Sequence, residues 1–276
     1  MLKILLAGEG GQGVQTVAAV LTKAAQTSKL KTSYIPSFGV EQRGGVSLAY
    51  VQIAEENIAY PRFEKADIVV IFCDRAIEVV EKFITDDTLF IYDNSAIHTK
   101  ALDDIKGKIK KSLPIAAQKL AQEKYSTKVL NMIILGALSS QIDDLDDSTI
   151  IDTIFDLLAT KIAKKPELKE LNLNAFDEGV NSVKDIDINN IEITGKAQEE
   201  IVKEFSDDKK TWTRFPEYCK GCALCIVRCP VKALRFSKEV GFLGNPIPEV
   251  DINTCIACGI CEKTCPDGAV KIEKKQ

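Results

Sequence analysis

Eight of the nine cysteines of the chain fall in two short runs between positions 219 and 265. The first run has the spacing C-x2-C-x2-C-x3-C-P and comprises Cys219, Cys222, Cys225 and Cys229. The second run repeats every one of these positions 36 residues later, with Cys255, Cys258, Cys261 and Cys265. Clustered cysteines in a reducing compartment usually bind metal instead of forming disulfides. The repeat predicts a pseudo-twofold metal-binding module.

This spacing is typical of [4Fe-4S] ligands, because a C-x2-C-x2-C loop places three thiolates around one cubane and the cysteine before proline reaches the other cluster. We therefore expect one cluster on Cys219, Cys222, Cys225 and Cys265. The second cluster is expected on Cys255, Cys258, Cys261 and Cys229. A pair of zinc sites is the alternative, but zinc typically uses two C-x2-C pairs. The module is predicted to move electrons one at a time.

A second candidate site is the glycine-rich loop near the amino terminus. Gly8, Gly10 and Gly13 satisfy G-x-G-x-x-G between an apolar run and an amphipathic pattern, as in dinucleotide-binding folds. The acid that would hold a nicotinamide ribose is missing, because the second strand ends at Ser37 and the nearest acid is Glu41. Three interpretations stay open: amides that bind a phosphate or pyrophosphate, a subunit contact, and a structural turn. The candidate residues are Gly10, Gly11, Gln12, Gly13 and Val14.

Arg43 is a further candidate, within the stretch Glu41-Gln42-Arg43-Gly44-Gly45 between two expected strands. It is either a solvated residue of a flexible hairpin turn or a group that meets an anion or a partner carboxylate. The residues alone do not decide between these interpretations.

Strands and helices alternate along residues 1–180, which favours an α/β domain with a largely parallel sheet, here a Rossmann-like three-layer domain. Strands are expected at 2–7, 32–35, 47–53, 67–73 and 88–92. Helices are expected at 14–27, 76–83, 115–124, 127–140 and 147–164. The strand at 47–53 follows its predecessor with no helix between, so this pair is expected to be antiparallel. Residues 181–211 are polar and are expected to be a linker with a helix near 197–205, and residues 212–276 a small α+β ferredoxin-like domain.

The composition points to a globular protein of 276 residues with a net charge of −4, which gives no support for a nucleic-acid partner. The longest apolar runs are far short of the roughly 20 residues that a membrane helix needs. With no signal-peptide pattern, the chain is expected to be cytoplasmic. Cys73 is interpreted as a buried core thiol, and the only histidine, His98, as a loop residue.

Several motifs together carry a resemblance to a known family. The segment Gly8 to Val14, with Pro36, Glu41 and Arg43-Gly44-Gly45, resembles the gamma subunit of 2-oxoacid:ferredoxin oxidoreductases. The carboxy-terminal module, including the lead-in Trp212-Thr213-Arg214, is similar to their delta subunit. The chain is therefore identified as a fused gamma and delta subunit.

The resemblance implies a subunit that is not active alone and has no catalytic residue of its own. Thiamine diphosphate and Mg²⁺ are expected on partner alpha and beta subunits, and ferredoxin or flavodoxin as the electron acceptor. It also implies that the Gly10 to Val14 loop lies near coenzyme A, with Arg43 at that ligand or at a subunit interface. Consistently, the chain lacks the thiamine-type G-D-G followed by N-N.

Pyruvate is the leading substrate expectation, with 2-oxoisovalerate and 2-oxoglutarate open. Two other functions remain alternatives: a free-standing nucleotide-binding iron-sulfur electron carrier, and a scaffold whose clusters are structural or sense oxidants.

Overall fold

The computed structural model describes residues 1–38, 45–189, 193–196, 202–241 and 245–275. Its chain divides into two units, Met1–Gln198 and Glu199–Gln276. Their boundary lies within the stretch expected to be a linker. Each unit is described by itself below.

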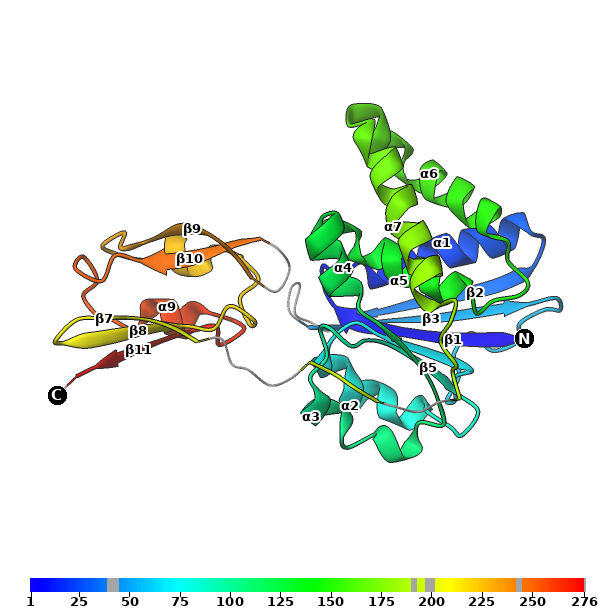
Figure 1. Cartoon of the computed structure of the whole chain (residues 1–276), viewed down its shortest axis with the longest axis horizontal. Helices are drawn as coiled ribbons and strands as arrows, with labels where there is room; N and C mark the ends of the chain where they lie inside the picture. The colour runs from blue at the N-terminus through cyan, green and yellow to red at the C-terminus, as the bar shows by residue number, and fades with distance from the viewer. Residues whose placement is uncertain (39–44, 190–192, 197–201, 242–244, 276) are drawn as a thin grey trace. The chain divides into compact units, whose positions relative to one another are not determined.

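The first unit is built on a six-stranded sheet with the order β2-β3-β1-β4-β5-β6 (Figure 1). Its strands are β1 (Leu2–Glu9), β2 (Lys31–Phe38), β3 (Val46–Ala54), β4 (Ile68–Ile71), β5 (Leu89–Asp93) and β6 (Lys111–Ile115). Strands β1, β4, β5 and β6 are parallel. Strand β3 runs antiparallel to both β1 and β2, as the missing helix before it predicts.

Helices cover both faces of this sheet, giving the expected three-layer arrangement (Figure 1). One face carries α1 (Val14–Thr27), α4 (Ala117–Lys124), α5 (Leu130–Ser139) and α7 (Glu167–Val183), with α6 (Asp147–Lys164) packed on α1. The other face carries the short α2 (Ile77–Val80) and α3 (Thr99–Leu102). Short 3₁₀ turns lie at Asp74–Ala76, Glu81–Phe83, Lys106–Lys108 and Thr127–Val129.

Three elements of the first unit are absent from the sequence prediction: strand β6, helix α7 and the one-turn helix α3. Strand β6 includes Pro114, which suits an edge strand because proline cannot donate to the sheet, and the helix expected from 115 begins only at Ala117. Helix α7 packs tightly on α5: a Cβ at Gly136 would lie 2.0 Å from the Phe176 carbonyl oxygen. A Cβ at Gly179 would lie 1.9 Å from the Ile133 carbonyl oxygen. This close crossing needs glycine on both helices.

The expected linker contributes to both units. Residue Ile188 accepts a hydrogen bond from the Ser112 amide, and the Tyr92 hydroxyl donates to the Thr194 carbonyl, so this stretch packs on the first unit. Further along, Lys203–Ser206 form strand β7 of the second unit, where a helix was expected near 197–205. Phe205 explains the strand, because its ring packs on buried Trp212 of the neighbouring strand. Residues 197–201 lie outside the described residues.

The second unit has a sheet of order β11-β8-β7 and a pair β10-β9. Its elements after β7 are β8 (Lys210–Arg214), α8 (Leu224–Val227), β9 (Leu234–Val240), β10 (Pro246–Val250), α9 (Ile260–Thr264) and β11 (Val270–Lys274). A shift of 36 residues places β8 on β10, α8 on α9 and the start of β9 on β11. The sequence repeat is therefore a structural repeat.

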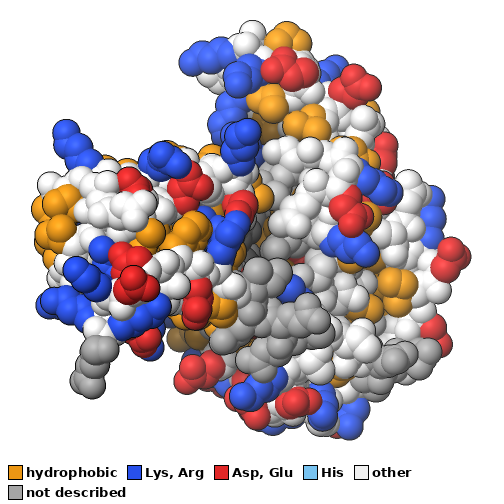
Figure 2. Space-filling view, turned by 60° about the vertical axis from the view of Figure 1, so that its left-hand side comes forward, with side chains coloured by type: hydrophobic (Ala, Val, Ile, Leu, Met, Phe, Trp, Pro, Cys, Tyr) orange, Lys and Arg blue, Asp and Glu red, His pale blue; other side chains and the backbone are white. Residues whose placement is uncertain are grey.

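The surface carries charges of both signs. On the face seen in Figure 2, Lys and Arg side chains are interspersed with Asp and Glu. Among the helices in the described part of the chain, none is long and apolar enough to cross a membrane.

Candidate metal centres

The cysteine loops of the second unit are shaped by residues with left-handed backbone conformation. These residues form three pairs separated by 36 positions: Gly221 (φ 66°) and Ala257 (φ 51°), Ala223 (φ 65°) and Gly259 (φ 78°), Lys232 (φ 52°) and Gly268 (φ 63°). Each pair has one glycine and one larger residue, so three non-glycine residues accept a conformation that costs of order 1 kcal/mol. The same strained path in both halves shows that the loops are matched in geometry.

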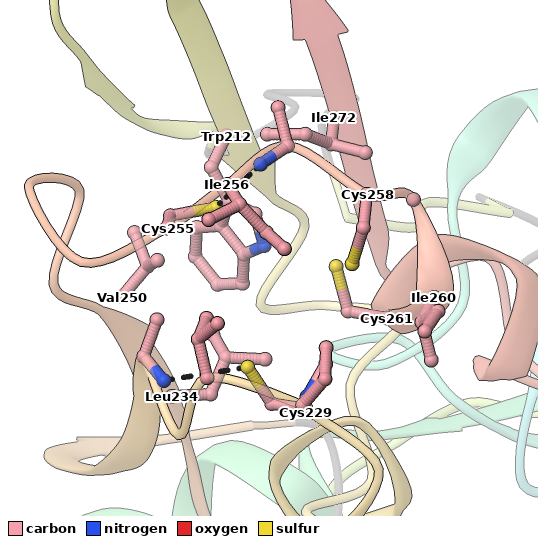
Figure 3. A pocket seen from close by; sticks show the side chains of 15 residues that line it. Trp212, Cys229, Leu234, Val250, Cys255, Ile256, Cys258, Ile260, Cys261 and Ile272 are labelled. Carbon is pink, nitrogen blue, oxygen red and sulfur yellow. Dashed lines mark hydrogen bonds between the residues drawn. The ribbon is translucent and has the colours of Figure 1, made fainter.

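Each loop, completed by one cysteine from the other half, borders its own cavity. Cys219, Cys222, Cys225 and Cys265 border one cavity. Cys255, Cys258, Cys261 and Cys229 border the other. Figure 3 shows the thiols of Cys229, Cys258 and Cys261 around this second cavity. Four thiols surrounding a common space suit a cubane, whose irons lie at separate corners.

Backbone amides point at several of these sulfur atoms. The Ala233 amide donates to Cys229 Sγ at 3.3 Å, and the equivalent Ala269 amide donates to Cys265 Sγ at 3.2 Å. A third amide, of Ala257, donates to Cys255 Sγ at 3.4 Å. Such donors stabilise negative charge on thiolate ligands.

Three of the cysteine thiols lie in surroundings that favour their neutral form. Burial raises the pKa of Cys219, and it raises the pKa of Cys225 to about 12, with neighbouring cysteines adding to both effects. Burial also raises the pKa of Cys261, partly offset by the nearby indole of Trp212. Because iron binds thiolates, assembly of a cluster here would release protons.

The walls of the two cavities differ. The cavity of the Cys219 set includes Lys220 and Asp267, whose Nζ and Oδ1 atoms are 2.8 Å apart, with side chains 8% and 6% exposed. The cavity of the Cys255 set has apolar walls and Trp212. Sequence reasoning missed the ion pair, because its partners are 47 positions apart and each reads as an ordinary surface charge.

Arg214, the other residue of the predicted lead-in, ties the halves of the second unit together. Its side chain is fully buried, donates to the Pro248 carbonyl at 2.6 Å and pairs with Glu239 at 2.5 Å. The contact joins β8 to the β9-β10 pair, so Arg214 has a structural role here.

In the first unit, the glycine-rich loop closes on itself. Gln12 is buried; its Oε1 accepts from the Glu9 amide at 2.7 Å, and its Nε2 donates to the Phe72 carbonyl at 3.1 Å. Gly13 precedes α1 with φ 83°, and a Cβ there would lie 2.7 Å from the Asn131 side chain. Val14 is buried as well.

Only the backbone of this loop is therefore left for a ligand. Gly11 is exposed, with φ 107°, and among the described residues no side chain caps the amino terminus of α1. Arg43, the other predicted ligand contact, lies outside the described residues.

Four titratable residues lie at or just after the carboxyl ends of strands β4 and β5 of the same sheet. His98 Nδ1 lies 2.5 Å from Asp74 Oδ2, and the His98 amide donates to Asp74 Oδ1, so this histidine fastens a loop. At the end of β5, Asp93 is almost fully buried. Burial raises its pKa to about 6, although hydrogen bonds from Ser95 and Gln118 act to lower it. Cys73 is also buried, which raises its pKa to about 12, in agreement with a core thiol.

Two family models match the chain in succession. The model described as pyruvate ferredoxin/flavodoxin oxidoreductase matches residues 3–182. The model described as a 4Fe-4S dicluster domain matches residues 191–270. The two matches follow the division into two units.

Several curated proteins are similar to this chain. The 2-oxoglutarate synthase subunit KorC of Methanothermobacter marburgensis is 31% identical over 180 residues, covering 64% of this chain and 94% of that protein. The common gamma subunit of the pyruvate/ketoisovalerate oxidoreductases of Pyrococcus abyssi is 27% identical, covering 60% of this chain and 91% of that protein. Against ketoisovalerate oxidoreductase subunit VorA of M. marburgensis, 26% identical over 64% of this chain, the match spans only 36% of the relative.

Solved structures of related oxidoreductases are also similar to this chain. The 2-oxoglutarate:ferredoxin oxidoreductase of Magnetococcus marinus, solved with 2-oxoglutarate, coenzyme A and succinyl-CoA bound, superposes with a TM-score of 0.62 at 25% identity. That match covers 74% of this chain and 35% of the other chain. Subunit PORC of the Thermotoga maritima pyruvate oxidoreductase, at 22% identity and a TM-score of 0.52, covers 66% of this chain and 97% of its own and shares the fold.

Proposed function

The chain belongs to the pyruvate ferredoxin/flavodoxin oxidoreductase family, as a gamma-type subunit followed by a 4Fe-4S domain, and from this we propose that it is the electron-transfer subunit of a 2-oxoacid:ferredoxin oxidoreductase. The proposed reaction is the coenzyme A-acylating oxidative decarboxylation of a 2-oxoacid. Thiamine diphosphate and Mg²⁺ would lie on partner alpha and beta subunits, and electrons would leave to ferredoxin or flavodoxin.

The observation that carries this proposal is the pair of cavities in the second unit. Each is bordered by three cysteines of one loop and the proline-preceding cysteine of the other, which is the crossed ligand pattern of two-cluster ferredoxins. The eight cysteines would hold two [4Fe-4S] clusters, which supply one-electron transfer when bound. The loops position the thiols, and the Ala233, Ala257 and Ala269 amides stabilise charge on sulfur. The apolar walls of the Cys255 cavity limit water there.

For the first unit we propose that the Gly10–Gly11 backbone and the start of α1 contact the pyrophosphate of coenzyme A. A helix of 14 residues offers amides and a positive dipole end to an anion. Support comes from the bound coenzyme A of the Magnetococcus marinus relative. The proposed roles of Gln12, Gly13 and Val14 narrow to shaping the loop, since their own contacts are internal. Arg43 stays a proposed contact to the ligand or to a partner subunit.

Pyruvate remains the proposed substrate, since the family model carries that name; relatives named for 2-oxoglutarate and ketoisovalerate keep the oxoacid open to experiment. A cytoplasmic location is proposed because eight clustered free cysteines suit a reducing compartment.

The test is anaerobic purification of the native complex, followed by a screen of 2-oxoacids for coenzyme A-dependent viologen reduction. We expect one oxoacid to reduce viologen only when coenzyme A is present, and partner subunits to copurify. Exchange of Gly11 for a bulky residue should raise the KM for coenzyme A. Tight binding of NADH or flavin by the isolated chain, with no oxoacid activity in the complex, would contradict the proposal and favour a free-standing carrier.

A further inference from the structure

Trp212 is the only tryptophan of the chain, and its side chain is fully buried in β8. Phe205 packs against it edge-on, with ring centroids 5.6 Å apart and ring planes 63° apart. On the paired strand β11, Ile272 lies opposite Trp212, and both residues line the cavity of the Cys255 set. The position of the indole is thus fixed by its neighbours.

The indole N–H is the one feature of Trp212 that packing leaves unexplained. Its Nε1 atom is buried, and within the described residues no protein atom accepts from it in good hydrogen-bond geometry, although the indole is near enough to the Cys261 thiol to lower the pKa of that group. Leaving a buried donor without an acceptor is unfavourable, because the donor has given up its hydrogen bond to water. Figure 3 shows the indole nitrogen on the edge of the ring that faces the cavity, on the side of Cys258 and Cys261. An occupant of the cavity that accepts hydrogen bonds would remove this cost.

The other half of the repeat provides an internal comparison. The residue 36 positions after Trp212 is Pro248, which lines the cavity of the Cys219 set. Pro248 pairs with Phe236 on β9, just as Trp212 pairs with Ile272 on β11. Proline has no N–H and cannot donate. At this pair of equivalent positions, only the cavity of the Cys255 set has a side-chain hydrogen-bond donor.

We propose that Trp212 Nε1–H donates a hydrogen bond to a sulfur of the cluster held by Cys229, Cys255, Cys258 and Cys261, and that this donor raises the reduction potential of that cluster above that of the other. The inference rests on the proposed [4Fe-4S] ligand sets. Hydrogen bonds to sulfur stabilise the negative charge added on reduction, which raises the potential. An electron delivered to the module by the partner subunits then resides mainly beside Trp212.

The ion pair at the other cavity does not reverse this order. Lys220 would raise and Asp267 would lower the potential of the nearby cluster, because a cation favours the reduced state and an anion disfavours it. Their charged atoms are only 2.8 Å apart, so the two effects largely cancel. The unpaired indole donor is the larger difference between the two sites.

A potential measurement tests the proposal on the full chain with both clusters assembled anaerobically. In an EPR-monitored redox titration, Trp212→Phe should lower the potential of one cluster and leave the other unchanged. We expect about a tenfold shift in the distribution of one electron between the clusters, which is about 59 mV. The matched control is Phe205→Leu, which removes the neighbouring ring but keeps the N–H, and it should leave both potentials in place.

A second measurement does not depend on a variant. Because the chain has one tryptophan, indole-¹⁵N labelling marks only Trp212. Pulsed EPR of the reduced wild-type chain should detect ¹⁵N coupling from the cluster of higher potential and none from the other. This test holds even where Trp212→Phe fails to assemble its clusters.

The results separate this inference from the proposed function. Three outcomes would overturn the role of Trp212 and leave the proposed function standing. These are two intact clusters with unchanged potentials in Trp212→Phe, an equal shift of both potentials, and no ¹⁵N coupling. A chain that assembles no [4Fe-4S] cluster, or reduces none at ferredoxin-like potentials, would overturn the proposed function itself.

Discussion

The glycine-rich loop of the first unit and the cysteine loops of the second unit both start a helix from a residue with left-handed backbone: Gly13, Ala223 and Gly259. Their side chains serve opposite purposes. Around Gly13 the polar groups bond to one another and Val14 enters a large apolar core. Around Ala223 and Gly259 the side chains surround a cavity. The side chains of the glycine-rich loop are satisfied by contacts within the protein, whereas those of the two cysteine loops surround a space that a bound group would fill.

Removal of iron is expected to have the largest effect, because it should unfold the second unit and leave the first unit folded. Among the described residues, the hydrophobic core of the second unit consists of two small groups of buried residues, and these include the proposed iron ligands Cys219, Cys225 and Cys261. Metal binding free energy is folding free energy in such modules. Chelation of iron should abolish amide-exchange protection across 203–274 and preserve it in β1, β4 and β5, as followed by hydrogen-exchange mass spectrometry. Retained protection in the iron-free second unit would show that its protein core suffices.

The crossed ligand sets give the next largest effect. Cys229→Ser should damage the cluster of the Cys255 set first, because Cys229 lies at that cavity, and Cys265→Ser should damage the cluster of the Cys219 set. Iron analysis with EPR of each variant measures the loss. If Cys229→Ser removes only the cluster of its own loop, the pairing of the halves is wrong.

A third comparison sets Gly13 against Gly259, which share a positive φ but differ in space. Gly13→Ala adds a Cβ at 2.7 Å from Asn131, whereas Gly259 has nothing within 4 Å among the described atoms. Gly259→Ala should cost about 1 kcal/mol from backbone strain, and Gly13→Ala about 2–4 kcal/mol because crowding adds to strain. Opening free energies from hydrogen exchange of each unit measure both.

Asn131→Ala provides the control for crowding. It should recover part of the loss in the Gly13→Ala background, and equal costs at Gly13 and Gly259 would show that strain alone matters.

The last prediction concerns the buried carboxyl of Asp93 and the dependence of stability on pH. Burial raises its folded-state pKa to about 6, above its ordinary value of 3.8. Between these values the folded chain holds a proton that the unfolded chain has released, so stability falls as pH rises from about 4 to about 6 and is level above. At about 1.4 kcal/mol per pKa unit, the loss is up to about 3 kcal/mol.

Asp93→Asn is the matched variant, because it removes the titration and keeps the shape. The difference in unfolding free energy between wild type and variant, from urea denaturation with first-unit amide protection as the probe, should shift by that amount across the window. A difference that is constant with pH would show that Asp93 is ionised throughout.

Local patterns in the sequence were informative wherever one short segment contains the whole signal. The alternation of apolar runs and helical patterns predicted the three-layer α/β unit, and the unaccompanied strand at 47–53 predicted the antiparallel β3. Helix α7 was missed although Ala175, Phe176 and Gly179 recur on one face. Its stability depends on the glycine-lined crossing with α5, which is a property of two distant segments.

The cysteine spacing by itself predicted which thiols border each cavity, because a tight loop can place only three of them around one cubane and the fourth is expected from the repeat. What only the tertiary structure decided is how the two sites differ. Trp212 lines one cavity and Pro248 lines the other, and Lys220 pairs with Asp267 at the second of these. These contacts arise because strand pairing brings together residues that are far apart in sequence. Repeated spacing makes the two halves alike, and packing makes them unequal.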